Sequence, residues 1–181
     1  MKIVSLSLAL LATLALPLAA QQMGSSNRNA PKIEQGIAFH DGGSLEISYT
    51  ALNFAEGKFM ENVKNERFRS MVNENAKENP VGTVELGGDM TIGGKQIAAG
   101  EYGLHFLLSD DGQWILTLSH KNDEGDVELI QWPLALTKAP MHAQRLTIAI
   151  SAGKGVTECN IHLHFGDQHI LVPAATAAEK N

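Results

Sequence analysis

Three histidines near the end of the chain have the residue type and spacing that could bind a metal ion. His162 and His164 alternate with apolar residues, and His169 follows the turn-forming pair Gly166-Asp167. Residues two apart on a strand share one face, with Cα atoms about 6.7 Å apart. If Gly166-Asp167 is a two-residue turn, His169 lies opposite His164. Three neutral imidazoles then converge, which suits zinc with an open fourth position that could activate water.

The alternative interpretation of these histidines is a solvent-exposed sheet face that simply carries polar residues. The alternation that groups the histidines puts Cys159 on the opposite face. We therefore expect Cys159 in the core as a small apolar residue rather than as a metal ligand or a nucleophile. Met141-His142 could supply a soft pair of copper ligands, but its place between Pro140 and Ala143 is more typical of loop packing.

Arg69, Asn73 and Glu74 form a second candidate site. An arginine with an amide and a carboxylate nearby can bind an anion or a small ligand. The alternative is an ion pair between Arg69 and Glu74 that ties this segment to the rest of the fold. The sequence contains no G-x-S-x-G, no H-E-x-x-H and no catalytic cysteine segment, which favours a non-catalytic protein.

The residues named above lie in or between short segments in which apolar and polar residues alternate, a pattern typical of β-strands. Glycine- and aspartate-rich turns separate them, and this spacing predicts an all-β fold, an antiparallel β-sandwich. One stretch, Gly57 to Asn79, has apolar residues at helical intervals and predicts one or two short helices between early strands. His105 and Leu104 point to opposite faces of the same predicted strand, and alternation alone does not decide whether the His105 face lies in the core or on the outer surface. The predicted strands are Ser44–Thr50, Val81–Leu86, Tyr102–Leu108, Trp114–Leu118, Leu146–Ile150 and Thr157–Phe165.

Composition and the two ends of the chain define its organisation. With 181 residues, one cysteine and a net charge of -6, we expect one domain without a disulfide framework and without a nucleic-acid partner. Residues 1–20, with Lys2 before an apolar run that ends in Ala19-Ala20, predict a signal peptide. The protein is then exported, to the periplasm or beyond the cell, and keeps no membrane span. We expect a flexible lead over 21–35, the sandwich over 36–173 and a loose tail over 174–181.

One run of the sequence is similar to a known family. Thr91 to Leu104, which reads TIGGKQIAAGEYGL, resembles a signature of the bacterial secreted domain-of-unknown-function family numbered 2911. Phe68 to Glu74 resembles its W-R-x-G-A-N-E segment, with Phe68 in place of tryptophan. The resemblance spans about Leu45 to Pro173. It implies a secreted β-sandwich of unknown activity and does not call for histidine in the C-terminal hairpin.

Two functions follow from these patterns. The first is an exported, non-catalytic β-sandwich that binds a small ligand, through Arg69, Asn73 and Glu74, or a partner surface, and needs no cofactor. The second is a zinc-binding protein, with or without hydrolytic activity, that uses His162, His164 and His169.

Overall fold

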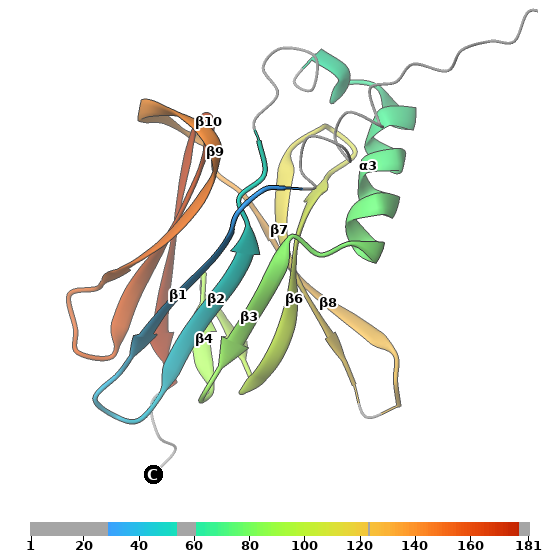
Figure 1. Ribbon diagram of the computed structural model, residues 1–181. Helices are drawn as coiled ribbons and strands as arrows, with labels where there is room; N and C mark the ends of the chain where they lie inside the picture. Colours follow the sequence, from blue (N-terminus) through green and yellow to red (C-terminus); the bar gives the residue numbers. More distant parts are fainter. Residues whose placement is uncertain (1–28, 54–60, 123, 178–181) are drawn as a thin grey trace, which may run out of the picture.

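Two antiparallel sheets packed face to face make up the part of the protein that the computed structural model describes, residues 29–53, 61–122 and 124–177 (Figure 1). Their spatial strand orders are β1-β2-β3-β6-β7-β8 and β5-β4-β10-β9. The predicted all-β sandwich is confirmed, and the predicted signal peptide lies outside the described residues. The elements are β1 (Lys32–Ala38), β2 (Ser44–Thr50), α3 (Glu66–Glu78), β3 (Gly82–Leu86), β4 (Met90–Ile92), β5 (Lys95–Ile97), β6 (Gly100–Leu108), β7 (Trp114–Lys121), β8 (Val127–Pro133), β9 (Thr137–Ala152) and β10 (Glu158–Thr176).

Element β10 folds back on itself at Gly166. The backbone amide of Thr176 donates to the carbonyl of Thr157 at 3.0 Å, so the two ends of this 19-residue element meet. A straight strand of this length would span about 60 Å. Gly166 has a φ of 60°, a left-handed conformation in which glycine avoids steric strain. In a hairpin with a two-residue turn at Gly166-Asp167, Phe165 lies opposite Gln168 and, further along the same two strands, Thr157 lies opposite Thr176. The hydrogen bond between Thr176 and Thr157 fits this register, so the expected reversal is confirmed.

Apolar side chains from both sheets fill the space between them. Ile47 and Leu104 come from the six-stranded sheet, and Ile148 and Leu163 come from the four-stranded sheet. The cavity left among them has a volume of about 20 Å³. That volume has room for about one water molecule, so this space between the sheets is a packed core rather than a ligand pocket.

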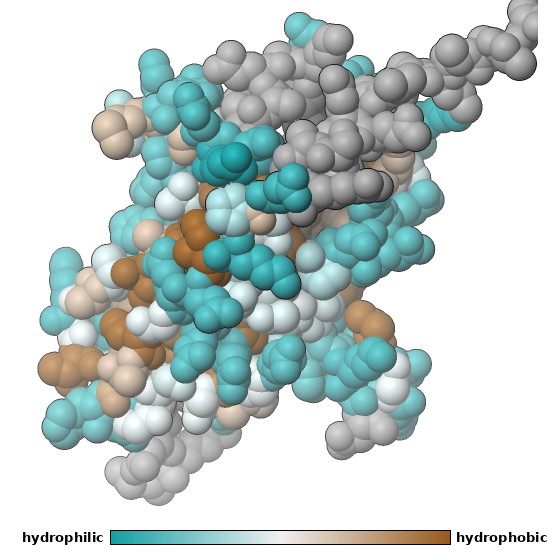
Figure 2. Space-filling model, in the orientation of Figure 1, coloured by the Kyte–Doolittle hydropathy of each residue, from teal (hydrophilic) through white to brown (hydrophobic). Residues whose placement is uncertain are grey.

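Side chains close the sandwich where β1 and β9 lie next to each other. The Gln35 amide donates to the Ile148 carbonyl at 2.7 Å and accepts from the Ile150 amide at 3.2 Å. The Tyr49 hydroxyl accepts from the Ile148 amide at 2.9 Å and donates to the Ile148 carbonyl at 3.2 Å. Hydrophobic side chains also gather on the side of Figure 2 where Figure 1 draws β1, β9 and β10. The free edge of β9 is thereby hydrogen-bonded within the chain at Ile148 and Ile150.

The opposite side of the sandwich is closed by Trp132 of β8. Its indole Nε1 donates to the Ile92 carbonyl at 3.0 Å, and the Lys95 ammonium lies 5.6 Å from the ring centroid. A Cβ at Gly93 would come within 2.8 Å of this ring, and Gly93 has a φ of 55°. The expected tight hairpin at Gly93-Gly94 is confirmed, since β4 and β5 pair on either side of it.

Helix α3 lies against β6 on the outer face of the six-stranded sheet (Figure 1). It begins after Asn65, whose side-chain oxygen accepts from the Phe68 amide, and its C-cap is Asn79, directly before Pro80. None of its residues is buried. The helix prediction is confirmed over 66–78, whereas 54–60 lie outside the described residues. In the described part of the chain, no helix has both the length and the apolar character needed to span a bilayer.

Both ends of the ordered domain extend further than predicted. The expected lead over 21–35 is wrong for its last residues, because β1 begins at Lys32 and Ile33 packs against the core. The expected tail is wrong at its start, because Ala174 is buried and pairs with Ile92 of β4. Both segments carry few large apolar side chains, so their backbone pairing leaves a weak hydrophobic signal in the sequence.

Candidate functional site

Three histidine rings converge on the outer face of the four-stranded sheet. The rings of His162 and His169 stack with centroids 5.5 Å apart, and His164 meets His169 edge-on at 6.2 Å. The intervening Ile161 and Leu163 are buried in the core. The reversal in β10 therefore brings His169 back beside the other two histidines, as the alternation predicted. A metal-binding role for them stays a prediction.

Fixed partners set the orientation of two of these rings. The Nε2 atom of His164 lies 2.7 Å from the carbonyl of Met141, and because a carbonyl can only accept, this nitrogen is the donor. The Nε2 atom of His162 lies 2.8 Å from the hydroxyl of Ser151. Its other nitrogen, Nδ1, lies 3.3 Å from Nε2 of His169. Each of these rings thus has one nitrogen held by β9.

The electrostatic environment favours the neutral form of His169. Burial, together with the positive charge that His162 and His164 would carry, lowers the pKa of His169. Neutral imidazole is the form that binds metal ions. Among the described residues, however, no group of three His, Cys, Asp or Glu side chains is already arranged so that it could hold one ion. The histidine cluster therefore consists of two facing nitrogens, His162 Nδ1 and His169 Nε2, with the His164 ring edge-on beside His169.

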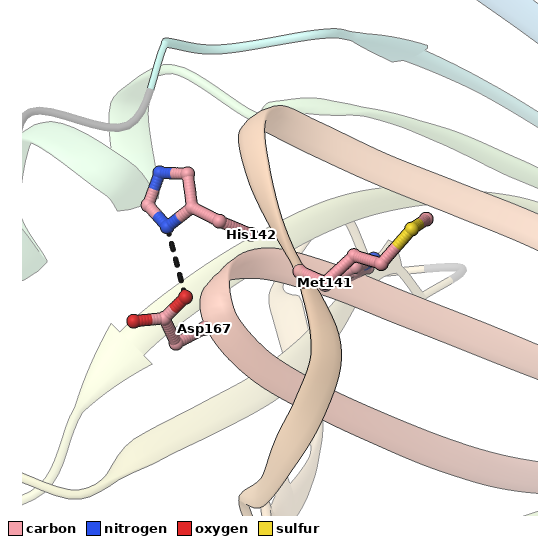
Figure 3. Close-up of polar contacts among 4 residues, drawn as sticks. Met141, His142 and Asp167 are labelled. Atoms are coloured by element: carbon pink, nitrogen blue, oxygen red, sulfur yellow. Dashed lines mark hydrogen bonds and ion pairs between the residues drawn. The ribbon is translucent and has the colours of Figure 1, made fainter.

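Met141 and His142 do not converge on a common point. In Figure 3 the His142 ring turns toward Asp167, and the Met141 side chain extends away from that ring. The Nδ1 atom of His142 lies 2.9 Å from a carboxylate oxygen of Asp167. The paired soft-ligand geometry that copper would require is therefore not assembled by this dipeptide.

Arg69, Asn73 and Glu74 are engaged in contacts within the fold. The Arg69 guanidinium donates to the Val63 carbonyl at 2.9 Å. Asn73 donates to the carbonyl of Leu108 at 2.8 Å and accepts from its amide at 2.7 Å, so it clamps α3 to the end of β6. Glu74 accepts from Ser70 within the helix. These contacts agree with a tethering role, although a hydrogen bond to Val63 replaces the expected ion pair, and ligand binding here stays a prediction.

His105 lies on the outer face of the six-stranded sheet, where α3 covers it. It is only 4% exposed. Its Nδ1 atom donates to the Ala76 carbonyl at 2.6 Å, and its Nε2 atom lies 2.8 Å from the Ser119 hydroxyl. Ala76 is in the last turn of α3, where carbonyls lack partners within the helix. His105 therefore holds the end of the helix against the sheet.

Cys159 lies in the core, as strand parity predicted. The residue is 1% exposed and belongs to the same apolar cluster as Ile161. Burial raises the pKa of its thiol. A protonated, inaccessible thiol is a poor nucleophile and a poor metal ligand.

A row of carboxylates on the outer face of the six-stranded sheet was not foreseen from the sequence. Glu46 faces Glu85 across β2 and β3, and Glu85 faces Glu101 across β3 and β6; we call these three residues the acidic row. Glu46 and Glu85 also line an open groove of about 440 Å³ together with Glu34. Strand alternation predicts that each glutamate points outward, but it does not predict the register between β2, β3 and β6 that places the three carboxylates opposite one another.

Most outward positions of the four-stranded sheet around the histidines carry no formal charge when the histidines are neutral; Arg145 of β9 and Glu158 at the start of β10 are the charged residues of the same parity. Leu171, which is 51% exposed, lies among them beside the histidine cluster. We call this set of residues the histidine face. It consists of Thr91, Gln96, Thr147, Ala149, Ser151, Asn160, His162, His164, His169, Leu171, Pro173 and Ala175.

Comparison with known proteins finds no match for this chain among protein-family models, curated proteins or solved structures. The resemblance of Thr91 to Leu104 to a secreted family therefore stays a prediction.

Proposed function

We propose that this protein is an exported, non-catalytic β-sandwich that binds a small ligand or a partner surface on its histidine face. One observation carries the location: this face combines neutral polar groups, a histidine cluster and the exposed Leu171. Side chains of this kind can bind a neutral ligand without a large desolvation cost for full charges. The packed core, with its cavity of about 20 Å³, favours binding at the surface.

Export is supported by the N-terminal pattern of one lysine, an apolar run and two small residues within residues 1–20. The expected mature protein begins near residue 21 and is found in the periplasm or outside the cell. Mass spectrometry of protein recovered from those fractions tests this directly. A mass that still includes residues 1–20 contradicts the proposal.

The location of binding can be tested with a matched pair of variants. Leu171→Glu places a charge on the histidine face, and Val127→Glu places one on β8, where Val127 is 60% exposed. A ligand that binds the native state raises the melting temperature. We expect small molecules that stabilise the native chain to stabilise Val127→Glu equally and Leu171→Glu much less. Equal stabilisation of Leu171→Glu contradicts this location.

Partner binding can be tested at the same two positions. A photo-crosslinking residue at Leu171 should yield a discrete adduct in the producing cells, while the same residue at Val127 should not. Adducts at both positions, or at Val127 alone, contradict binding through the histidine face.

A second candidate function is zinc binding, with or without hydrolytic activity, at His162, His164 and His169. The observation that favours it is the 3.3 Å separation between His162 Nδ1 and His169 Nε2. Metal analysis of protein purified without a histidine tag, and of His164→Ala, tests this function. Stoichiometric zinc in the native chain supports it, and absence of stoichiometric metal from both samples contradicts it.

A further inference from the structure

We infer that the histidine cluster binds one divalent ion of the imidazole-binding class, Cu²⁺, Ni²⁺ or Zn²⁺, through His162 Nδ1 and His169 Nε2, with Ser151 as a positioning residue. This inference rests on the second proposed function and narrows it, because it assigns two of the three histidines as the ligands and defines the class of ion.

The separation of the two nitrogens matches a shared ion. His162 Nδ1 and His169 Nε2 lie 3.3 Å apart. Two nitrogens that each lie about 2.0–2.1 Å from a tetrahedral ion are separated by about 3.3–3.4 Å. Both rings belong to β10, on either side of its reversal at Gly166, so the backbone already places the two donors at the required distance.

Ser151 determines which nitrogen of His162 faces His169. Its hydroxyl lies 2.8 Å from Nε2 and can accept the proton of that nitrogen. The lone pair of the neutral ring is then on Nδ1, which accepts the hydrogen bond from Nε2–H of His169 in the metal-free chain. A bound ion takes the place of that proton, which moves to Nδ1 of His169, so both facing nitrogens then present lone pairs. A metal-bound histidine commonly donates its other N–H to a fixed acceptor, which sets the ring orientation. Ser151 therefore positions the ligand without touching the ion.

The donor chemistry selects the class of ion. Both donors are imidazole nitrogens, whereas Mg²⁺ and Ca²⁺ prefer oxygen ligands. The nearby carboxylate of Asp167 contacts His142 instead of the nitrogen pair. Among divalent ions that accept imidazole, affinity rises from Ni²⁺ to Cu²⁺ and falls again at Zn²⁺. We expect Cu²⁺ to bind most tightly and Mg²⁺ not to compete.

The experiment is a titration of the untagged chain with CuSO₄ alone, followed by calorimetry and electron paramagnetic resonance. We expect one equivalent to bind, with nitrogen hyperfine structure, in the presence of excess Mg²⁺. The double variant His162→Asn, His169→Asn should lose this binding. His120→Asn, on β7 of the other sheet, is the matched control and should bind like the native chain.

Ser151 is tested by two further variants. Ser151→Ala should weaken Cu²⁺ binding about 10–100-fold, with an unchanged melting temperature in the absence of metal. Ser151→Thr keeps the hydroxyl and should restore most of the affinity. The inference is overturned if the native chain binds no stoichiometric Cu²⁺, if the double histidine variant binds it equally, or if Ser151→Ala has native affinity. Ligand-induced stabilisation that persists without copper binding would leave the first proposed function standing.

Discussion

The two outer faces of the sandwich use their polar side chains differently. On the six-stranded sheet, Asn73 and His105 form hydrogen bonds that fasten α3 to β6, with backbone atoms of Leu108 and Ala76 as partners. On the four-stranded sheet, His162 and His169 contact each other. Polar groups bonded to the backbone stabilise the fold, whereas groups that pair mainly with one another can exchange that contact for a ligand.

Charge separates the same two faces. The acidic row places carboxylates directly opposite one another in the register of β2, β3 and β6. The residues of the histidine face carry no formal charge when its imidazoles are neutral, and the charged neighbours of the same parity are Arg145 and Glu158. A neutral face is the better surface for a neutral ligand or for a metal ion that requires unprotonated imidazole.

The largest effect should come from breaking the Asn73 clamp. Asn73→Ala removes both hydrogen bonds to Leu108, so the backbone amide and carbonyl of Leu108 lose their side-chain partner. We expect a loss of about 2–3 kcal/mol in the free energy of unfolding, measured by urea denaturation. Glu74→Ala is the matched control one residue away and should change it by less than about 0.5 kcal/mol. Equal effects of the two variants would contradict the tethering role of Asn73.

Replacing His105 should have the next largest effect. His105→Leu introduces an apolar side chain of similar size and removes the hydrogen-bond partners of the Ala76 carbonyl and the Ser119 hydroxyl. We expect a destabilisation of about 1–2 kcal/mol. Hydrogen exchange should show the fastest new exchange in the last turn of α3. Unchanged exchange in that turn would mean that His105 does not hold the helix.

Removing the central charge of the acidic row should slightly stabilise the protein. In Glu85→Gln, the repulsion with Glu46 and Glu101 disappears. We expect a gain of about 0.5 kcal/mol at pH 7, and this gain should shrink in 1 M NaCl because salt screens exposed charges. Thr83→Gln, on the same face of β3, is a control that changes no charge. A loss of stability in Glu85→Gln would contradict the predicted repulsion.

The smallest effect concerns a contact that joins the two sheets. Asp41, in the turn between β1 and β2, accepts a hydrogen bond from Thr176 of β10, and this bond lowers the pKa of Asp41 below its ordinary value of 3.8. A lowered carboxyl pKa adds stability that is present above the ordinary pKa and is lost as pH falls through the lowered value. Asp41→Asn should therefore lower the melting temperature slightly at pH 7 and not at pH 2. A difference that persists at pH 2 would contradict this linkage.

Local patterns were sufficient to predict much of the fold. Alternation assigned Cys159 to the core and the three histidines to the outside, because strand parity is a local property. Turn chemistry predicted the reversals at Gly93-Gly94 and Gly166-Asp167, because few other residues adopt positive φ there.

Features that depend on contacts between distant segments could not be predicted. The alignment of Glu46 with Glu85 depends on the register between β2 and β3. The role of Asn73 depends on where α3 docks, and none of the buried residues lies on that helix. Strand β8 was missed although its Trp132 closes one side of the sandwich, because its exposed first residues obscure the core pattern.

The most direct test of the histidine face is a side-chain NMR spectrum of the protein labelled with ¹⁵N-histidine, recorded with and without one equivalent of Zn²⁺. All seven histidines of the chain report in one experiment. We predict that the signals of His162 and His169 shift together, while those of His40, His105 and His120 remain unchanged. Shifts confined to histidines outside the cluster, or no shift at all, would contradict the account.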